Sequence, residues 1–138
     1  MSTKISIIHI KDYRNIQEAI IKGIELIEDS FKFNLRDLSN ILLKPNLLRA
    51  TEDACTQPSF VEGVLSYLTK KGINMEKVSI GDSPGQIKTS ASNIAKKIGL
   101  YEVVEKKGVK FVYFELPMHN CLLKHLQIEP EFFLRGEI

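Results

Sequence analysis

The sequence has few of the residues that mark specialised classes of protein. It holds two cysteines among 138 residues, Cys55 and Cys121, and they form neither a Cys-x-x-Cys pair nor a ferredoxin-like run. No signal peptide precedes them, so we expect reduced thiols and a cytoplasmic location. No apolar stretch approaches the roughly 18 residues needed to cross a bilayer, so we expect no membrane partner.

Charge of one sign is also scarce. The 19 Lys and Arg residues and the 17 Asp and Glu residues leave a formal net charge of +2. The basic residues are scattered, and their pairs fall at predicted helix ends, where they complement the helix dipole. We therefore expect no nucleic-acid partner. With 43% hydrophobic and 26% charged residues, the chain has the composition of a globular domain able to bury a core.

Apolar runs and helical stripes alternate along the chain. Runs of β-branched and apolar residues predict buried strands, and apolar residues three and four positions apart predict helices. The predicted order is strand 4–10, helix 14–31, strand 39–44, helix 58–71, strand 77–81, helix 87–107 with a break at Gly99, and strand 109–116. This order predicts an α/β fold, a three-layer, doubly wound, mostly parallel sheet with helices on both faces. We expect one domain over residues 1–138, the N-terminal part of a larger domain.

The motif Lys44-Pro45-Asn46 follows the second predicted strand directly. Pro45 keeps the preceding residue extended and ends the run, so a cation and an amide project from the carboxyl end of the strand. Ligands of open α/β sheets bind outside these ends, which makes Lys44 and Asn46 candidate ligand-binding residues. Alternatively, Lys44 is only solvated and Asn46 closes a turn. The loop that follows leaves the same edge and adds Thr56 to the candidates.

A second motif, Gly-Asp-Ser-Pro-Gly at residues 81–85, follows the third predicted strand in the same way. Glycine lets a backbone approach a ligand closely, and Ser83 is predicted to cap a helix that starts at Pro84. Asp82, Ser83 and Gly85 are therefore candidate ligand-binding residues. Asp82 could bind a cation, hold a ligand hydroxyl or close an Asx turn. The motif is neither Gly-x-Gly-x-x-Gly nor a Walker A sequence, so it identifies no nucleotide or other cofactor.

Two further sets of residues invite a catalytic or metal-binding interpretation. Cys55 has no histidine beside it in sequence, and a thiol without a base is more often inert than catalytic. His119, Cys121 and His125 match no zinc spacing and lack a fourth ligand. We therefore predict no metal site, and the sequence names no catalytic residue.

Taken together, the motifs resemble the N-terminal half of domain-of-unknown-function family 362. The resemblance rests on residues 43–47 (Leu-Lys-Pro-Asn-Leu), Thr56-x-Pro58 and residues 80–85, followed by the Ile-Gly-Leu at 98–100 and the Gly-Val at 108–109. It covers roughly residues 41–114 in order, and three motifs in sequence are more specific than any one alone. The resemblance implies a prokaryotic, intracellular α/β protein, often joined to ferredoxin-like iron-sulfur modules, with no assigned reaction.

Three hypotheses of function follow from these features. The first is a site for a small anionic metabolite or cofactor, in which Lys44 neutralises charge, the glycine-containing backbone cradles the ligand, and Asn46, Thr56 and Asp82 orient it. The second is a redox accessory domain that docks a ferredoxin-like iron-sulfur module, which rests on the family resemblance alone. The third is a non-catalytic interaction or homo-oligomerisation domain, since a partial sheet exposes an edge.

Overall fold

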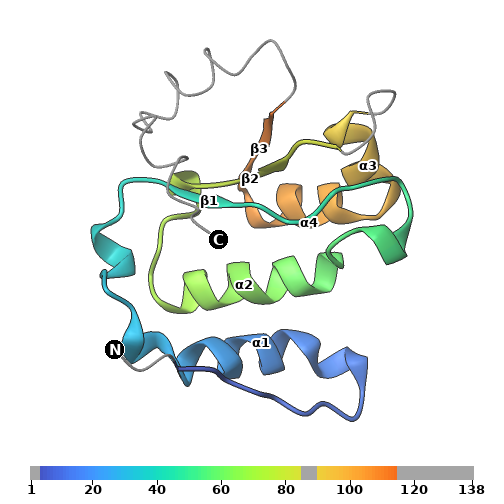
Figure 1. Cartoon of the computed structure of the whole chain (residues 1–138). Coiled ribbons are helices and arrows are strands. Elements are labelled where there is room, and N and C mark those ends of the chain that lie inside the picture. The colour runs from blue at the N-terminus through green and yellow to red at the C-terminus, as the bar shows by residue number, and fades with distance from the viewer. Residues whose placement is uncertain (1–3, 85–89, 115–138) are drawn as a thin grey trace.

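Three parallel strands form the sheet of this protein. The computed structural model describes residues 4–84 and 90–114. Within them, β1 (Ile41–Leu43), β2 (Val78–Asp82) and β3 (Lys110–Tyr113) lie side by side in the order β1-β2-β3 (Figure 1). Every residue of β2 is buried, which agrees with its central place between β1 and β3. The predicted α/β class and the parallel sheet are confirmed.

The helices between the strands are α2 (Pro58–Lys70), α3 (Ala91–Lys97) and α4 (Leu100–Lys107). Because the strands follow one another in chain order, right-handed crossovers place these connections on the same side of the sheet. Figure 1 shows α2 and α4 together on one side of it. A doubly wound sheet requires the order of the strands to reverse, and the three described strands do not reverse. The two-sided arrangement therefore stays a prediction.

Helix ends follow the expected signals at two of three places. The predicted break at Gly99 is confirmed, since this residue has a φ of 80° between α3 and α4. Pro58 begins α2 as predicted, with Gln57 at the N-cap position. The predicted cap at Ser83 is wrong, because Ser83 and Pro84 are not helical. Instead Ser90 caps α3, where its side chain accepts a hydrogen bond of 3.2 Å from the backbone N–H of Asn93.

Residues 4–10, predicted as the first strand of the sheet, form no strand, and that prediction is wrong. The segment runs along α1 (Ile16–Glu25) on the side away from α2 (Figure 1). Lys4 forms an ion pair with Asp29, while Ile5 and Ile7 are 80% and 87% exposed. A β-branched pattern favours an extended backbone but does not choose its partner, and here alternate side chains face a helix instead of a neighbouring strand.

The helix predicted over residues 14–31 is shorter than expected. It consists of α1, with 3₁₀ turns at Tyr13–Asn15 and Glu28–Ser30. Its apolar face packs on α2, and α2 shares a core cluster with β2, so α1 forms a layer of its own beyond α2 (Figure 1). None of the helices in the described part of the chain is long and apolar enough to cross a membrane.

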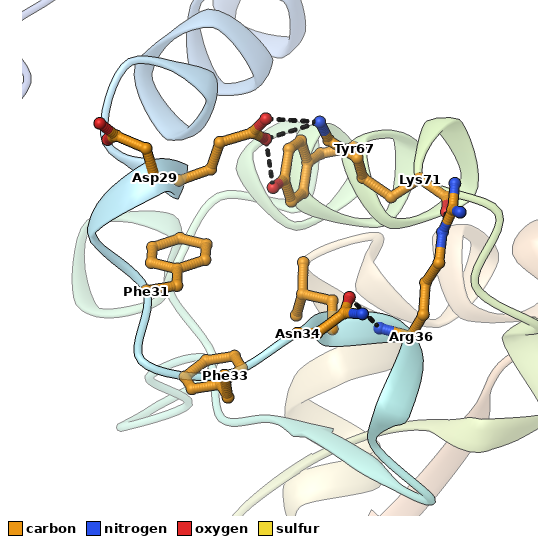
Figure 2. A pocket seen from close by; sticks show the side chains of 9 residues that line it. Asp29, Phe31, Phe33, Asn34, Arg36, Tyr67 and Lys71 are labelled. Carbon is orange, nitrogen blue, oxygen red and sulfur yellow. Dashed lines mark hydrogen bonds and ion pairs between the residues drawn. The ribbon is translucent and has the colours of Figure 1, made fainter.

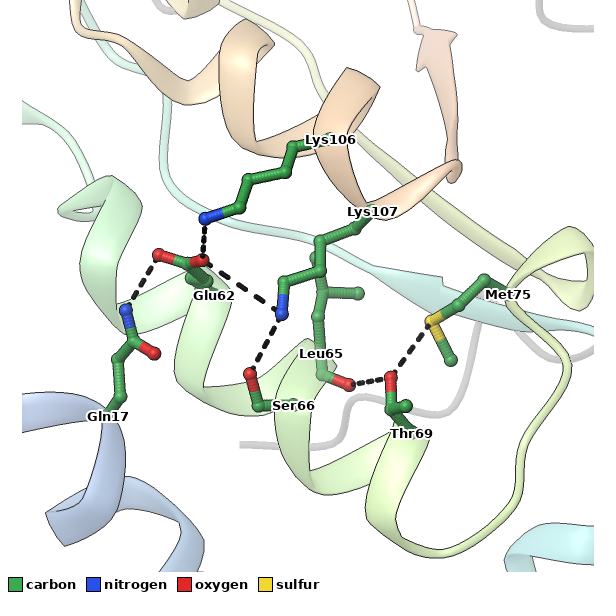
Figure 3. Close-up of polar contacts among 8 residues, drawn as sticks. All are labelled: Gln17, Glu62, Leu65, Ser66, Thr69, Met75, Lys106 and Lys107. Carbon is green, nitrogen blue, oxygen red and sulfur yellow. Dashed lines mark hydrogen bonds and ion pairs between the residues drawn. The ribbon is translucent and has the colours of Figure 1, made fainter.

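Glu62 of α2 joins three helices through its carboxylate. It accepts a hydrogen bond of 2.7 Å from Gln17 Nε2 of α1 and one of 3.1 Å from Lys106 Nζ of α4 (Figure 3). Lys107 Nζ lies 3.9 Å from the same carboxylate and donates to Ser66 Oγ at 3.1 Å. The side chain of Glu62 is only 16% exposed, so these partners compensate a charge held largely away from water. They fix α2 against α1 and α4.

Candidate functional site

The carboxyl ends of β1 and β2 bring Lys44 and Asp82 together. Leu43 pairs with Ile80 across the two parallel strands, so the residues that follow the strands leave the sheet side by side. Lys44 Nζ lies 2.5 Å from Asp82 Oδ1. The side chain of Lys44 is 65% exposed and that of Asp82 only 4%, so the ion pair joins a solvent-facing cation to a buried anion. The sequence-based expectation that the two motifs share one edge of the sheet therefore holds for these two residues.

Asp82 also holds the loop that follows β1. Its Oδ2 atom accepts a hydrogen bond of 2.7 Å from the backbone N–H of Leu47, a residue with no exposed surface. Its Oδ1 atom is buried and, in the described part of the chain, accepts no hydrogen bond, although it contacts the Lys44 ammonium. Asp82 therefore anchors the loop with one oxygen and pairs with the lysine through the other.

Asn46 and Thr56 form a second pair, which closes the loop between them. The backbone N–H of Asn46 donates to Thr56 Oγ1 at 2.9 Å, and the N–H of Thr56 donates to the Asn46 carbonyl at 2.9 Å. The side-chain amide of Asn46 donates to the Ala54 carbonyl at 3.1 Å. This use of the amide favours the alternative interpretation of Asn46, in which it closes a turn. Thr56 accepts a hydrogen bond here, so its own O–H is not consumed by the pair.

Lys44 and Thr56 both line a cavity of about 320 Å³ between β1 and the first two turns of α2. We call it the β1–α2 cavity. Six of its eight lining residues are apolar, and no acidic side chain is among them. The complete lining is Leu42, Leu43, Lys44, Pro45, Thr56, Phe60, Val61 and Val64. Phe60 is exposed (44%), as several other large apolar side chains of the described residues are. The cavity thus combines a cation and a hydroxyl with an apolar wall.

The apolar wall was not anticipated as part of a site. The helix expected over residues 58–71 rests on one apolar stripe, which consists of Phe60, Val61, Val64, Leu65 and Leu68. In the structure Leu65 and Leu68 are buried in the core, whereas Phe60 and Val64 are partly exposed and line the cavity. The stripe has the ordinary spacing of a core-facing helix, so the sequence alone does not show that its edge lines a cavity.

The remaining candidates contribute less. Ser83 follows Asp82 at the same strand end and is exposed, and Gly85 lies outside the described residues. Cys55 Sγ donates to the Arg49 carbonyl at 2.9 Å, so the thiol stabilises the loop conformation. His119, Cys121 and His125 lie outside the described residues. No group of three His, Cys, Asp or Glu side chains suited to a metal ion occurs within residues 4–84 and 90–114.

A second cavity, of about 260 Å³, lies between the end of α2 and the turns after α1. Figure 2 shows Tyr67 and Lys71 across this hollow from the stacked rings of Phe31 and Phe33. The Glu28 carboxylate accepts hydrogen bonds of 2.7 Å from Lys71 Nζ and 2.8 Å from Tyr67 Oη. Those two bonds, that of Lys71 above all, hold the pKa of Glu28 below its usual value. These groups satisfy one another's charges and hydrogen bonds. The residues around the second cavity therefore connect α2 to the turn after α1.

The burial of Tyr67 predicts a loss of stability in alkali. Burial, and secondarily the hydrogen bond to Glu28, raise the pKa of Tyr67 to about 12. An acid whose pKa is higher in the folded state than in the unfolded state stabilises the fold below its unfolded pKa. The stabilisation is then lost as the pH rises from about 10 to about 12. We expect the wild-type chain to lose about 2 kcal/mol more than a Tyr67→Phe variant across that interval.

Urea unfolding of both chains at intervals between pH 8 and pH 12 measures this difference. The other ionisable groups are common to both proteins, so the comparison isolates the Tyr67 hydroxyl. If the two curves fall in parallel, the Tyr67 hydroxyl has the same pKa folded and unfolded, and the prediction is wrong.

The comparisons with known proteins identify a family and nothing narrower. The family described as Domain of unknown function (DUF362) matches residues 41–129, which include β1, β2, β3 and the β1–α2 cavity. This match confirms the resemblance stated from the motifs. No curated protein matches the chain, and no solved structure does.

Proposed function

The chain belongs to this family of unknown function, and we propose that it binds a small organic anion in the β1–α2 cavity. One observation carries the proposal. Lys44 and Thr56, two donors predicted to bind a ligand, line the same cavity, and each is held in place by another residue. Asp82 orients Lys44, and Asn46 holds Thr56. Donors fixed before a ligand arrives lose less conformational entropy on binding, which favours affinity.

The electrostatics of the cavity favour an anion. An ammonium group has three N–H donors, and the contact with Asp82 uses one direction only, which leaves the exposed remainder of the group for a ligand. The first turn of α2 contributes wall residues and contains no acidic side chain, so the positive end of the helix dipole is not neutralised there. The iron-sulfur and self-association hypotheses have no comparable support among the described residues and stay predictions.

Replacing Lys44 with methionine is expected to weaken anion binding at least tenfold. Methionine keeps the apolar stem but removes a charge-assisted hydrogen bond, which contributes about 1.5–3 kcal/mol. The matched control is Lys77→Met, because Lys77 is an exposed lysine next to the opposite end of β2. Butanoate, benzoate and inorganic phosphate serve as probes, titrated into the labelled chain while the backbone amide resonances are followed by NMR.

The proposal requires shifts at Lys44, Asn46 and Thr56 that saturate, that persist in Lys77→Met, and that are lost in Lys44→Met. If none of the three probes shifts these amides, or if both variants bind alike, the β1–α2 cavity is not an anion site.

A further inference from the structure

The wall of the β1–α2 cavity indicates the chemistry of the part of the ligand that Lys44 does not contact. Phe60, Val61 and Val64 line it from α2. Leu42 and Leu43 line it from β1, together with Pro45, which follows Lys44. A hydroxylated or multiply charged molecule would bind such a surface weakly, because each polar group would lose its water without finding a partner. Every methylene that leaves water makes the free energy of binding more favourable. The wall therefore selects an apolar body.

The volume of the cavity indicates how large a body it can cover, since the cavity is open to solvent beside Phe60. Its 320 Å³, at about 30 Å³ for each water-sized group, has room for about ten heavy atoms. This is the lower end of the range for small-molecule sites, which excludes nucleotides and most folded cofactors from full enclosure.

The charge around the cavity limits the head group. Lys44 is the one cation in the lining, and Asp82 already compensates part of its charge. A phosphate monoester carries about −1.5 to −2 at neutral pH and presents three oxygens. A carboxylate carries one charge and two oxygens, which matches one ammonium and one hydroxyl, those of Lys44 and Thr56.

We infer that the ligand is a monocarboxylic acid with an apolar body, about ten heavy atoms in all, whose carboxylate meets Lys44 and Thr56 and whose body lies against Phe60 and Val64. The inference rests on the proposed anion site and goes further, because it names the class of ligand. A chain acid of this size corresponds to octanoate, and branched or aromatic acids of equal volume belong to the same class.

A series of straight-chain carboxylates tests the inference on the 138-residue chain. Acetate, butanoate, hexanoate, octanoate and decanoate are titrated by calorimetry, with hexanamide as the uncharged analogue of hexanoate. Each methylene that enters the cavity is expected to tighten binding by up to about fourfold. The gain is expected to stop near octanoate, where the cavity is full, whereas adsorption to an exposed apolar surface would continue to strengthen with decanoate.

A wall variant separates packing from charge. Val64→Thr keeps the shape of the side chain and replaces a methyl group with a hydroxyl, so we expect octanoate to bind about three- to tenfold more weakly and acetate to bind unchanged. Val103→Thr is the matched control, because Val103 is a partly buried valine of α4 that does not line the cavity.

The outcomes distinguish the two proposals. If acetate and octanoate bind equally at Lys44, the inference about the apolar body is wrong and the anion site stands. If affinity keeps rising through decanoate, the inference that the cavity holds about ten heavy atoms is wrong. If hexanamide binds as tightly as hexanoate, the β1–α2 cavity binds apolar groups without a contribution from the charge of Lys44, and the anion site is wrong. Phosphate binding more tightly than every carboxylate would also overturn the inference while it supports an anion site.

Discussion

A Gly81→Ala variant is expected to unfold with a free energy about 3 kcal/mol lower than that of the wild-type chain. Gly81 is buried in the central strand and pairs with Val112 of β3. A β-carbon at this position would lie 3.0 Å from the Val112 carbonyl carbon, still closer to its oxygen, and 3.1 Å from Phe114 Cε2. A backbone carbonyl cannot turn aside as the end of a flexible side chain can. Overpacking of this kind costs about 1–3 kcal/mol, and a clash with backbone belongs at the upper end.

A second glycine supplies the control. Gly23 lies in α1, where a β-carbon would meet Ile8 Cγ1 at 3.4 Å, an ordinary van der Waals distance. Alanine is favoured over glycine inside a helix by up to about 1 kcal/mol, so Gly23→Ala is expected to be neutral or stabilising. Urea unfolding of both variants measures the contrast. Equal midpoints for Gly81→Ala and the wild-type chain would show that β2 and β3 separate at no cost, contrary to the argument from close approach.

An Asp82→Ala variant is expected to lose about 2–3 kcal/mol of stability together with the order of residues 46–56. The Leu47 N–H, which is buried and donates to Asp82 Oδ2 at 2.7 Å, would be left without an acceptor. A buried donor without a partner costs about 1–3 kcal/mol, and the hydrogen bond to a charged acceptor is lost as well. Lys44 would lose its anchor but remain solvated, since its side chain is 65% exposed, and would add little to the cost.

The asparagine variant separates the two tasks of this carboxylate. Asp82→Asn keeps an oxygen for the Leu47 N–H and is expected to recover most of the stability. It also removes the charge that compensates Lys44, and this effect outweighs the loss of orientation, so anion binding in the β1–α2 cavity is expected to strengthen severalfold. Opposite signs for stability and affinity are expected to separate the loop anchor at Oδ2 from the ion pair at Oδ1.

Hydrogen exchange at the Leu47 amide gives a local readout of the same event. We expect strong protection in the wild-type chain, a large loss in Asp82→Ala and a partial loss in Asp82→Asn. Asp53→Ala is the control, because Asp53 is 74% exposed and its contacts with Thr51 and Arg49 lie at the surface, where they contribute little; stability should not change measurably. Equal protection in all variants would mean that the loop does not depend on Asp82.

Much of the candidate site was determined by local chemistry that a sequence displays. Pro45 ends a strand, and in a parallel sheet all the carboxyl ends lie at one edge, so the Lys44 and Asp82 motifs had to approach each other once both strands were recognised. The break at Gly99 is also local, because a left-handed conformation costs glycine little and other residues much more. The break at Gly99 depends on backbone preferences within a few residues, whereas the meeting of the two motifs also requires β1 and β2 to be neighbours in the sheet.

Other features depended on which surfaces meet, and only the tertiary structure decided them. Residues 4–10 have the pattern of a strand, yet they lie along α1, because hydrophobic burial is non-directional and a helix face can replace a neighbouring strand. The side-chain amide of Asn46 is part of a turn because the fold places the Ala54 carbonyl where it accepts a hydrogen bond from this amide. The β1–α2 cavity exists because α2 turns Phe60 and Val64 toward β1 while Leu65 enters the core, and a helical stripe alone does not say where its edge will lie.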